Sequence, residues 1–151
     1  MLAFLSTLYL HPPLTAFPLA LLVTAAALEA MHLYKRKIIF NKIGKYTVII
    51  ASIFTGLAYL SGYPASESAN RTFLVSDEAI SWHHTMGRVL LITTFVCSAF
   101  AIVESKAKYY VRTFRVLYLI FLIASLLMVL YTGYLGGKLV FEHGAGVYAS
   151  G

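Results

Sequence analysis

Histidine is the residue type in this sequence best suited to hold a metal ion or a haem iron, and the chain carries five histidines. His83 and His84 are adjacent, His11 precedes a Pro-Pro pair, and His143 precedes a glycine. Imidazole is the commonest metal ligand in proteins and binds haem iron axially. We therefore treat His11, His83, His84 and His143 as candidate ligands.

The residues after His84 suit a haem in particular. Gly87 lies about one helical turn from the histidine pair, and its missing side chain leaves room for a flat macrocycle. Arg88 lies one turn from His84, where a guanidinium can pair with carboxylates such as haem propionates. Neighbours on a helix point about 100° apart, so we expect only one of His83 and His84 to face the other helices. With a single cysteine, Cys97, the chain has no attachment motif for c-type haem, and the pattern predicts haem b.

Two imidazoles must approach one iron from opposite sides, so the ligands should come from different segments. His84 is the first choice, because Arg88 shares its face. His143 is the second, because the glycines that follow it let the chain bend toward the helices. His11 is the third. The sequence therefore predicts that His84 and His143 hold the iron and that His32 does not.

Two other interpretations of the histidines stay open. Three imidazoles with one open position suit zinc, and imidazole also suits copper. Alternatively, the histidines cap helices and bind loops in a non-redox accessory or anchoring subunit of a larger membrane complex.

Composition fixes the class of protein. The chain has 151 residues, 60% of them hydrophobic, and a mean hydropathy of +0.78, which is typical of integral membrane proteins. We predict an all-α fold, in which residues 1–151 form one transmembrane four-helix bundle. The expected spans are residues 13–33, 46–63, 80–104 and 112–135.

Two segments are expected to interrupt the helices. Paired glycines cost a helix about 1 kcal/mol each relative to alanine, so we expect a break at Gly136-Gly137 and a tail that folds back to present His143. Residues 64–75 are expected to be a polar connector. Ser76, followed by Asp77 and Glu78, is expected to cap the third helix.

The basic residues indicate the orientation. Nine of the twelve lysines and arginines lie in the loops after the first and third expected spans. Under the positive-inside rule these loops are cytoplasmic, which places both termini outside. His11, His83, His84 and His143 then share the outer side. This topological role accounts for the net charge of +6, and nucleic-acid binding is excluded as a function.

Two further short motifs, at residues 29–32 and 70–72, do not indicate a functional site by themselves. Glu29 and His32 form a Glu-x-x-His pair, half of a carboxylate-bridged di-iron motif, but the chain has no second copy. We expect Glu29 to pair with the basic loop at residues 35–45, and no other residue supports a quinone site there. Asn70-Arg-Thr72 matches a glycosylation acceptor, which has meaning only in a host that glycosylates this side.

The two ends of the chain carry a resemblance. The segments HPPLTAFPL, from His11, and GGKLVFEHGAGV, from Gly136, are similar to the entry and exit motifs of a family of small prokaryotic membrane proteins, described only as a domain of unknown function. The resemblance implies four spans and a prokaryotic cytoplasmic membrane, but no activity. In that family a second histidine often precedes the Phe-Pro, where this chain has Ala16.

These observations predict a small cytochrome b-like subunit. It would carry electrons between a quinol or a neighbouring membrane redox subunit and a periplasmic or extracellular carrier. The chain has no soluble domain and no nucleotide motif, so we expect a subunit rather than a complete enzyme.

Overall fold

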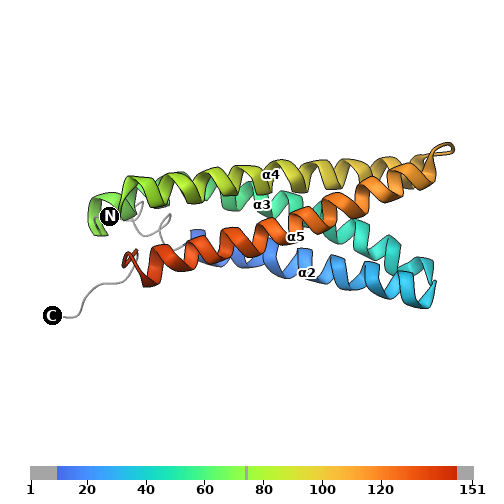
Figure 1. Ribbon diagram of the computed structural model, residues 1–151, viewed down its shortest axis with the longest axis horizontal. Helices are drawn as coiled ribbons and strands as arrows, with labels where there is room; N and C mark the ends of the chain where they lie inside the picture. The colour runs from blue at the N-terminus through green and yellow to red at the C-terminus, as the bar shows by residue number, and fades with distance from the viewer. Residues whose placement is uncertain (1–9, 74, 146–151) are drawn as a thin grey trace.

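Four long helices make up the part of the chain that the structure describes (Figure 1). The computed structural model describes residues 10–73 and 75–145, with only the backbone for 68 and 70–73, so the Asn70 side chain lies outside the described part. The helices are α2 (His11–Lys35), α3 (Ile38–Phe73), α4 (Asp77–Lys106) and α5 (Val111–Phe141). The predicted all-α four-helix fold is confirmed.

The helices form an antiparallel bundle in which each helix contacts two neighbours. α2 packs most extensively against α3, and α4 against α5, while α2 and α5 contact each other least among the four neighbouring pairs. The turns at residues 36–37 and 107–110 lie at one end of the bundle, and α2 begins and α5 ends at the other (Figure 1). Connections this short bring each helix back beside the preceding one. We call the end where α2 begins the histidine end and the opposite end the basic end.

The surface of the bundle shows that it lies in a membrane. All four helices are long and apolar enough to cross one. Large apolar side chains point outward from every helix and are 47–59% exposed, for example Val23, Ile53, Ile92 and Ile123. Soluble proteins rarely leave so much contiguous apolar surface in water. The chain is therefore a multi-pass membrane protein, and its outer surface contacts lipid.

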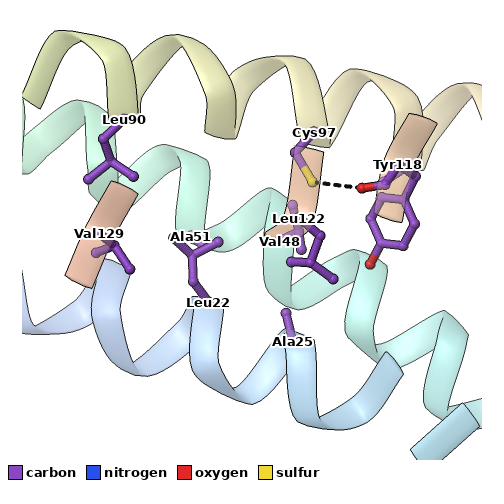
Figure 2. Close-up of a cluster of buried hydrophobic side chains, with 10 residues drawn as sticks. Leu22, Ala25, Val48, Ala51, Leu90, Cys97, Tyr118, Leu122 and Val129 are labelled. Carbon is purple, nitrogen blue, oxygen red and sulfur yellow. Dashed lines mark hydrogen bonds between the residues drawn. The ribbon is translucent and has the colours of Figure 1, made fainter. Parts of the chain in front are cut away.

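Mostly apolar side chains, from alanine to Tyr118 in size, fill the centre of the bundle (Figure 2). Ala25, Ala51 and Ala101 are fully buried, and their short side chains let the helices approach closely. The Cys97 thiol is also fully buried and donates to the Tyr118 carbonyl at 3.7 Å. The central cluster contains Leu22, Ala25, Val48, Ala51, Leu90, Cys97, Ala101, Tyr118, Leu122 and Val129.

The helix ends confirm one local prediction and correct two. Ser76 caps α4, and its hydroxyl accepts a hydrogen bond from the Ala79 amide at 3.3 Å. The predicted connector at residues 64–75 is wrong, because α3 continues to Phe73 with Pro64 inside it. The predicted break at Gly136-Gly137 is also wrong, because α5 runs through both glycines to Phe141.

The glycine that ends α5 is Gly144 rather than the glycine pair. Gly144 adopts a left-handed conformation with φ of +69°, which costs glycine little. Its amide donates to the Val140 carbonyl at 3.1 Å, and the Ala145 amide donates to the Leu139 carbonyl at 2.9 Å. These bonds satisfy carbonyls that the end of the helix leaves free.

Candidate functional site

A cavity of about 720 Å³ lies inside the histidine end, between all four helices. Its volume falls within the range of about 300–1,000 Å³ found for small-molecule and cofactor sites. Three imidazoles line it, and the other lining side chains are mostly apolar and small. The imidazoles belong to His11, His83 and His84, and five glycines line the same space: Gly62, Gly87, Gly133, Gly136 and Gly137.

His11 is the first residue of α2, and a hydrogen bond fixes its ring. Its Nδ1 lies 2.9 Å from the Ser61 hydroxyl on α3. Ser61 donates its own proton to the Ala58 carbonyl at 2.8 Å. The hydroxyl must therefore accept from Nδ1–H of His11. This tautomer leaves the lone pair of Nε2 free to bind a metal.

His83 lies between His11 and α5. Its ring centre is 6.3 Å from that of His11, and the two ring planes are nearly perpendicular, at 87°. Nδ1 of His83 is buried beside the backbone carbonyl of Thr132, but no hydrogen bond to it meets normal geometry. A buried nitrogen without a partner costs about 1–3 kcal/mol. In other proteins such an atom often meets an ordered water, an ion or a ligand.

His84 lies on the α3 side of the cavity. Its ring centre is 4.9 Å from that of Tyr63 and 6.5 Å from that of His83. The sequence predicted that only one of the two neighbouring histidines would face the bundle, and this is wrong, because both line the cavity. His83 reaches toward α5 and His84 toward α3, so the two rings border different walls.

Two glycines let the rings approach the helix backbones. A Cβ at Gly62 would lie 3.3 Å from Cε1 of His11 and 3.4 Å from Cε1 of His84. A Cβ at Gly136 would lie 3.3 Å from Cε1 of His83. These contacts are tighter than a side chain normally accepts. Glycine at both positions therefore makes the histidine arrangement possible.

The structure does not bring His143 to this group. His143 is exposed beyond the end of α5 and does not line the cavity. Arg88 also lies outside the cavity, on the surface, where its Nε donates to the Tyr59 hydroxyl at 3.3 Å. Gly87, in contrast, does line the cavity. The sequence-based pairing of His84 with His143 thus joins residues that the fold holds apart.

The alternative of a three-imidazole metal ion finds no matching geometry. Among residues 10–73 and 75–145, no group of three or more His, Cys, Asp or Glu side chains is placed to hold one ion. His32 lies at the basic end, where its Nδ1 is 2.9 Å from the Lys37 carbonyl in the turn after α2. Its role there is local.

The basic end holds a second buried polar group, centred on Glu29. The Glu29 carboxylate accepts hydrogen bonds from Asn41 and Tyr118, each at 3.0 Å, and forms an ion pair with Arg115. We expected Glu29 to pair with the basic residues at 35–45. That expectation is wrong, because the cation is Arg115 on α5, which the antiparallel fold returns to the same end.

A second ion pair completes this polar group. Lys45 of α3 lies 3.1 Å from Glu104 of α4, and Glu104 lies 3.9 Å from Arg115. With Glu29, two carboxylates and two cations thus connect all four helices. Buried charges in a membrane need such partners. This group therefore ties the four helices together, although Glu104 Oε2 and Arg115 Nη1 have no hydrogen-bond partner within it.

The sequence reasoning missed Ser61, Gly62 and Gly136 as parts of the site. Gly136 was expected to break α5, and Ser61 and Gly62 were not considered as site residues. A signal for Gly62 is its spacing, because Thr55, Ala58, Gly62 and Ala65 recur on one face of α3 and line the cavity. Ala16 also lines the cavity.

Comparison with known proteins gives one match. The model of the family described as "Predicted membrane protein (DUF2231)" matches residues 7–149. No curated protein and no solved structure matches the chain. The match agrees with the resemblance at the two ends of the sequence and with the four apolar helices.

Proposed function

This chain belongs to the family of predicted membrane proteins described as DUF2231, and we propose that it is a haem b-binding electron-transfer subunit. The observation that carries the proposal is the juxtaposition of His11 and His83 in an apolar cavity between the helices. In this proposal His11 and His83 replace His84 and His143 as the axial ligands. Haem, when bound, supplies one-electron transfer.

The spacing of the two rings supports shared ligation. Two imidazoles on opposite sides of one metal ion, with metal–nitrogen bonds of about 2 Å, have ring centres roughly 6 Å apart. The centres of His11 and His83 are 6.3 Å apart. Ordinary edge-to-face packing of aromatic rings also gives centre-to-centre distances of about 4.5–7 Å. The distance therefore supports ligation only together with the hydrogen bonding of the ring nitrogens.

Both rings have a nitrogen that needs a partner. Ser61 holds Nδ1–H of His11 and leaves Nε2 free. Haem- and metal-binding histidines commonly donate their other ring N–H in this way, which fixes the ring and raises its basicity. Nδ1 of His83 is buried beside the Thr132 carbonyl of α5. If Nδ1 carries the proton toward that carbonyl, Nε2 of His83 is the nitrogen that would hold an iron.

The cavity walls suit a macrocycle. The glycines of α5 leave a flat surface beside His83, and Leu90 and Val129 close the cavity toward the centre of the bundle. Thr15 and Thr132 add hydroxyl groups at half-buried positions of the lining. An apolar wall that excludes water and two imidazoles that orient an iron are what a protein supplies to haem. Arg88 lies on the surface outside the cavity and has no role in the proposed site.

We propose the orientation of the protein in the membrane from the distribution of its basic residues. We place the basic end in the cytoplasm of a prokaryotic cell and the histidine end at the outer face, under the positive-inside rule. The haem would then lie near the periplasmic or extracellular side. Its electron partners would be a quinol or a neighbouring membrane redox subunit and an outer carrier.

The test is an optical spectrum of the purified protein. We expect the protein, expressed with a haem precursor, to show low-spin b-type absorbance in a reduced-minus-oxidised spectrum. His11→Ala and His83→Ala should lose it, whereas His143→Ala and His32→Ala should keep it. If the wild-type protein shows no such absorbance even after incubation with hemin, the proposal fails and the non-redox anchoring role replaces it.

A further inference from the structure

Among residues 10–73 and 75–145, the exposed residues that line the cavity at the histidine end lie on one side of the bundle. Every lining residue of α3 and α4 is buried or half-buried, including Ala58, Gly62 and Leu90. The exposed lining residues all belong to α2 and α5. They are Pro12, Ala16 and Leu19 of α2 and Gly133, Val140 and Phe141 of α5.

The opening coincides with the weakest seam of the bundle. α2 and α5 contact each other less than any other neighbouring pair. Small residues face the seam from both helices, with Ala16 on α2 and Gly133 and Gly137 on α5. A Cβ at Gly133 or at Gly137 would meet no atom within 4 Å. The space beside these glycines is therefore open.

The seam lies along the lipid-facing surface. Gly133 is one turn from Leu130, which is 50% exposed, and both lie within the apolar length of α5. On α2, Leu19 and Val23 are 37% and 47% exposed beside the opening. Side chains of this kind contact acyl chains in a membrane. In a membrane that covers this apolar length, an opening between them would face the bilayer.

We infer that the cavity receives its occupant sideways from the bilayer, through the gap between α2 and α5, and that this occupant is a planar amphiphile. We infer a flat occupant because glycines form the α5 wall of the cavity. We infer an apolar body for it because the other lining side chains are mostly apolar. A polar edge fits the three imidazoles at the histidine end. The identity of the occupant as haem rests on the proposed function, but the route of entry does not depend on iron.

The route is tested by the accessibility of a nitroxide spin label in vesicles of phosphatidylcholine. Gly133→Cys is labelled in a Cys97→Ala background, with Leu130→Cys as the lipid-facing control on the same helix. Tyr109→Cys, in the exposed turn before α5, is the water-facing control. We expect the label at Gly133 to collide with dioxygen, as at Leu130, and to be shielded from water-soluble nickel ethylenediaminediacetate. Stronger collision with the nickel complex, as at Tyr109, would overturn the inference.

A second measurement uses hemin uptake and separates the inference from the proposed function. Gly133→Trp places a bulky ring in the opening, and Leu130→Trp places it on the lipid face. If hemin enters sideways, Gly133→Trp slows the rise of Soret absorbance several-fold and Leu130→Trp does not. Equal rates for the two variants would contradict lateral entry. If the wild type binds no hemin while the Gly133 label still collides with dioxygen, the haem proposal falls and the lateral opening stands.

Discussion

Nδ1 of His11 on α2 and the Ser61 hydroxyl on α3 lie 2.9 Å apart, and this bond decides which nitrogen of His11 is free. The Ser61 proton is committed to the Ala58 carbonyl. The first residue of one helix is thus oriented by the backbone of the next. In many proteins a hydrogen bond from the other ring nitrogen holds a metal-binding imidazole in place.

Removal of the Ser61 hydroxyl should weaken the site without unfolding the bundle. We expect Ser61→Ala to lower hemin affinity about tenfold, because loss of an orienting hydrogen bond commonly costs about 10–100-fold. Ser61→Thr keeps the hydroxyl and should restore binding. Titration of the apoprotein with hemin measures the effect. Ser105→Ala at the basic end, which removes a similar hydrogen bond to a helix carbonyl, is the control. Unchanged affinity of Ser61→Ala would contradict the assigned tautomer.

Two glycines of α5 offer a matched pair for the packing of His83. A Cβ at Gly136 would press on the His83 ring at 3.3 Å, whereas a Cβ at Gly133 meets nothing within 4 Å. Both changes to alanine favour the helix by up to about 1 kcal/mol. We therefore expect Gly133→Ala to raise thermal stability and to lower hemin affinity less than Gly136→Ala does. Gly136→Ala should lower hemin affinity, and equal affinities would argue against this position of His83.

The ion pair between Glu29 and Arg115 should contribute strongly to stability. Glu29→Ala removes the carboxylate that Arg115 and Tyr118 contact. Breaking a buried ion pair by removing one partner costs about 3–5 kcal/mol, because a buried charge stays behind. Unfolding in mixed detergent micelles measures this loss.

The control for that measurement is the exposed pair of Lys138 and Glu142. Exposed pairs contribute little, so Glu142→Ala should leave the unfolding midpoint nearly unchanged. The double variant Glu29→Leu with Arg115→Leu should recover much of the stability, because neither charge is left alone. Equal midpoints for Glu29→Ala and Glu142→Ala would refute a strong contribution of the Glu29–Arg115 ion pair to stability.

The orientation of the bundle can be measured with single cysteines. Lys37→Cys and Tyr109→Cys lie in the two turns of the basic end, and Ser76→Cys lies at the opposite end. Cys97 is fully buried and should stay unlabelled. In intact cells we expect a membrane-impermeant maleimide to label Ser76→Cys alone. Labelling of Lys37→Cys and Tyr109→Cys instead would reverse the predicted topology.

The fold was predictable from sequence because long apolar runs between basic clusters leave few alternatives. The four helices and the Ser76 cap follow from composition and local hydrogen bonding. The errors arose at residues whose intrinsic preference against a helix is outweighed by the membrane environment. Gly136-Gly137 and Pro64 disfavour a helix in water, but in a bilayer every backbone group must find a partner within the chain, so the helix continues.

The site was only half predictable. That His11, His83 and His84 belong together followed from assigning them to one side of the membrane. That His143 stays apart depends on α5 continuing through the glycine pair, which places His143 beyond the helix end and outside the cavity lining. Arg115 as the partner of Glu29 depends on which helices are neighbours, and one sequence does not contain that information.

The central claim is that His11 and His83 hold one haem iron, and electron paramagnetic resonance of the oxidised protein tests it most directly. The two ring planes stand at 87°, and perpendicular imidazole planes give a strongly anisotropic low-spin ferric signal. We expect this signal in the hemin-loaded wild type and in His143→Ala. His11→Ala should convert it to a high-spin signal. A rhombic low-spin signal of parallel imidazoles, or a low-spin signal that survives His11→Ala and disappears in His143→Ala, would contradict the account.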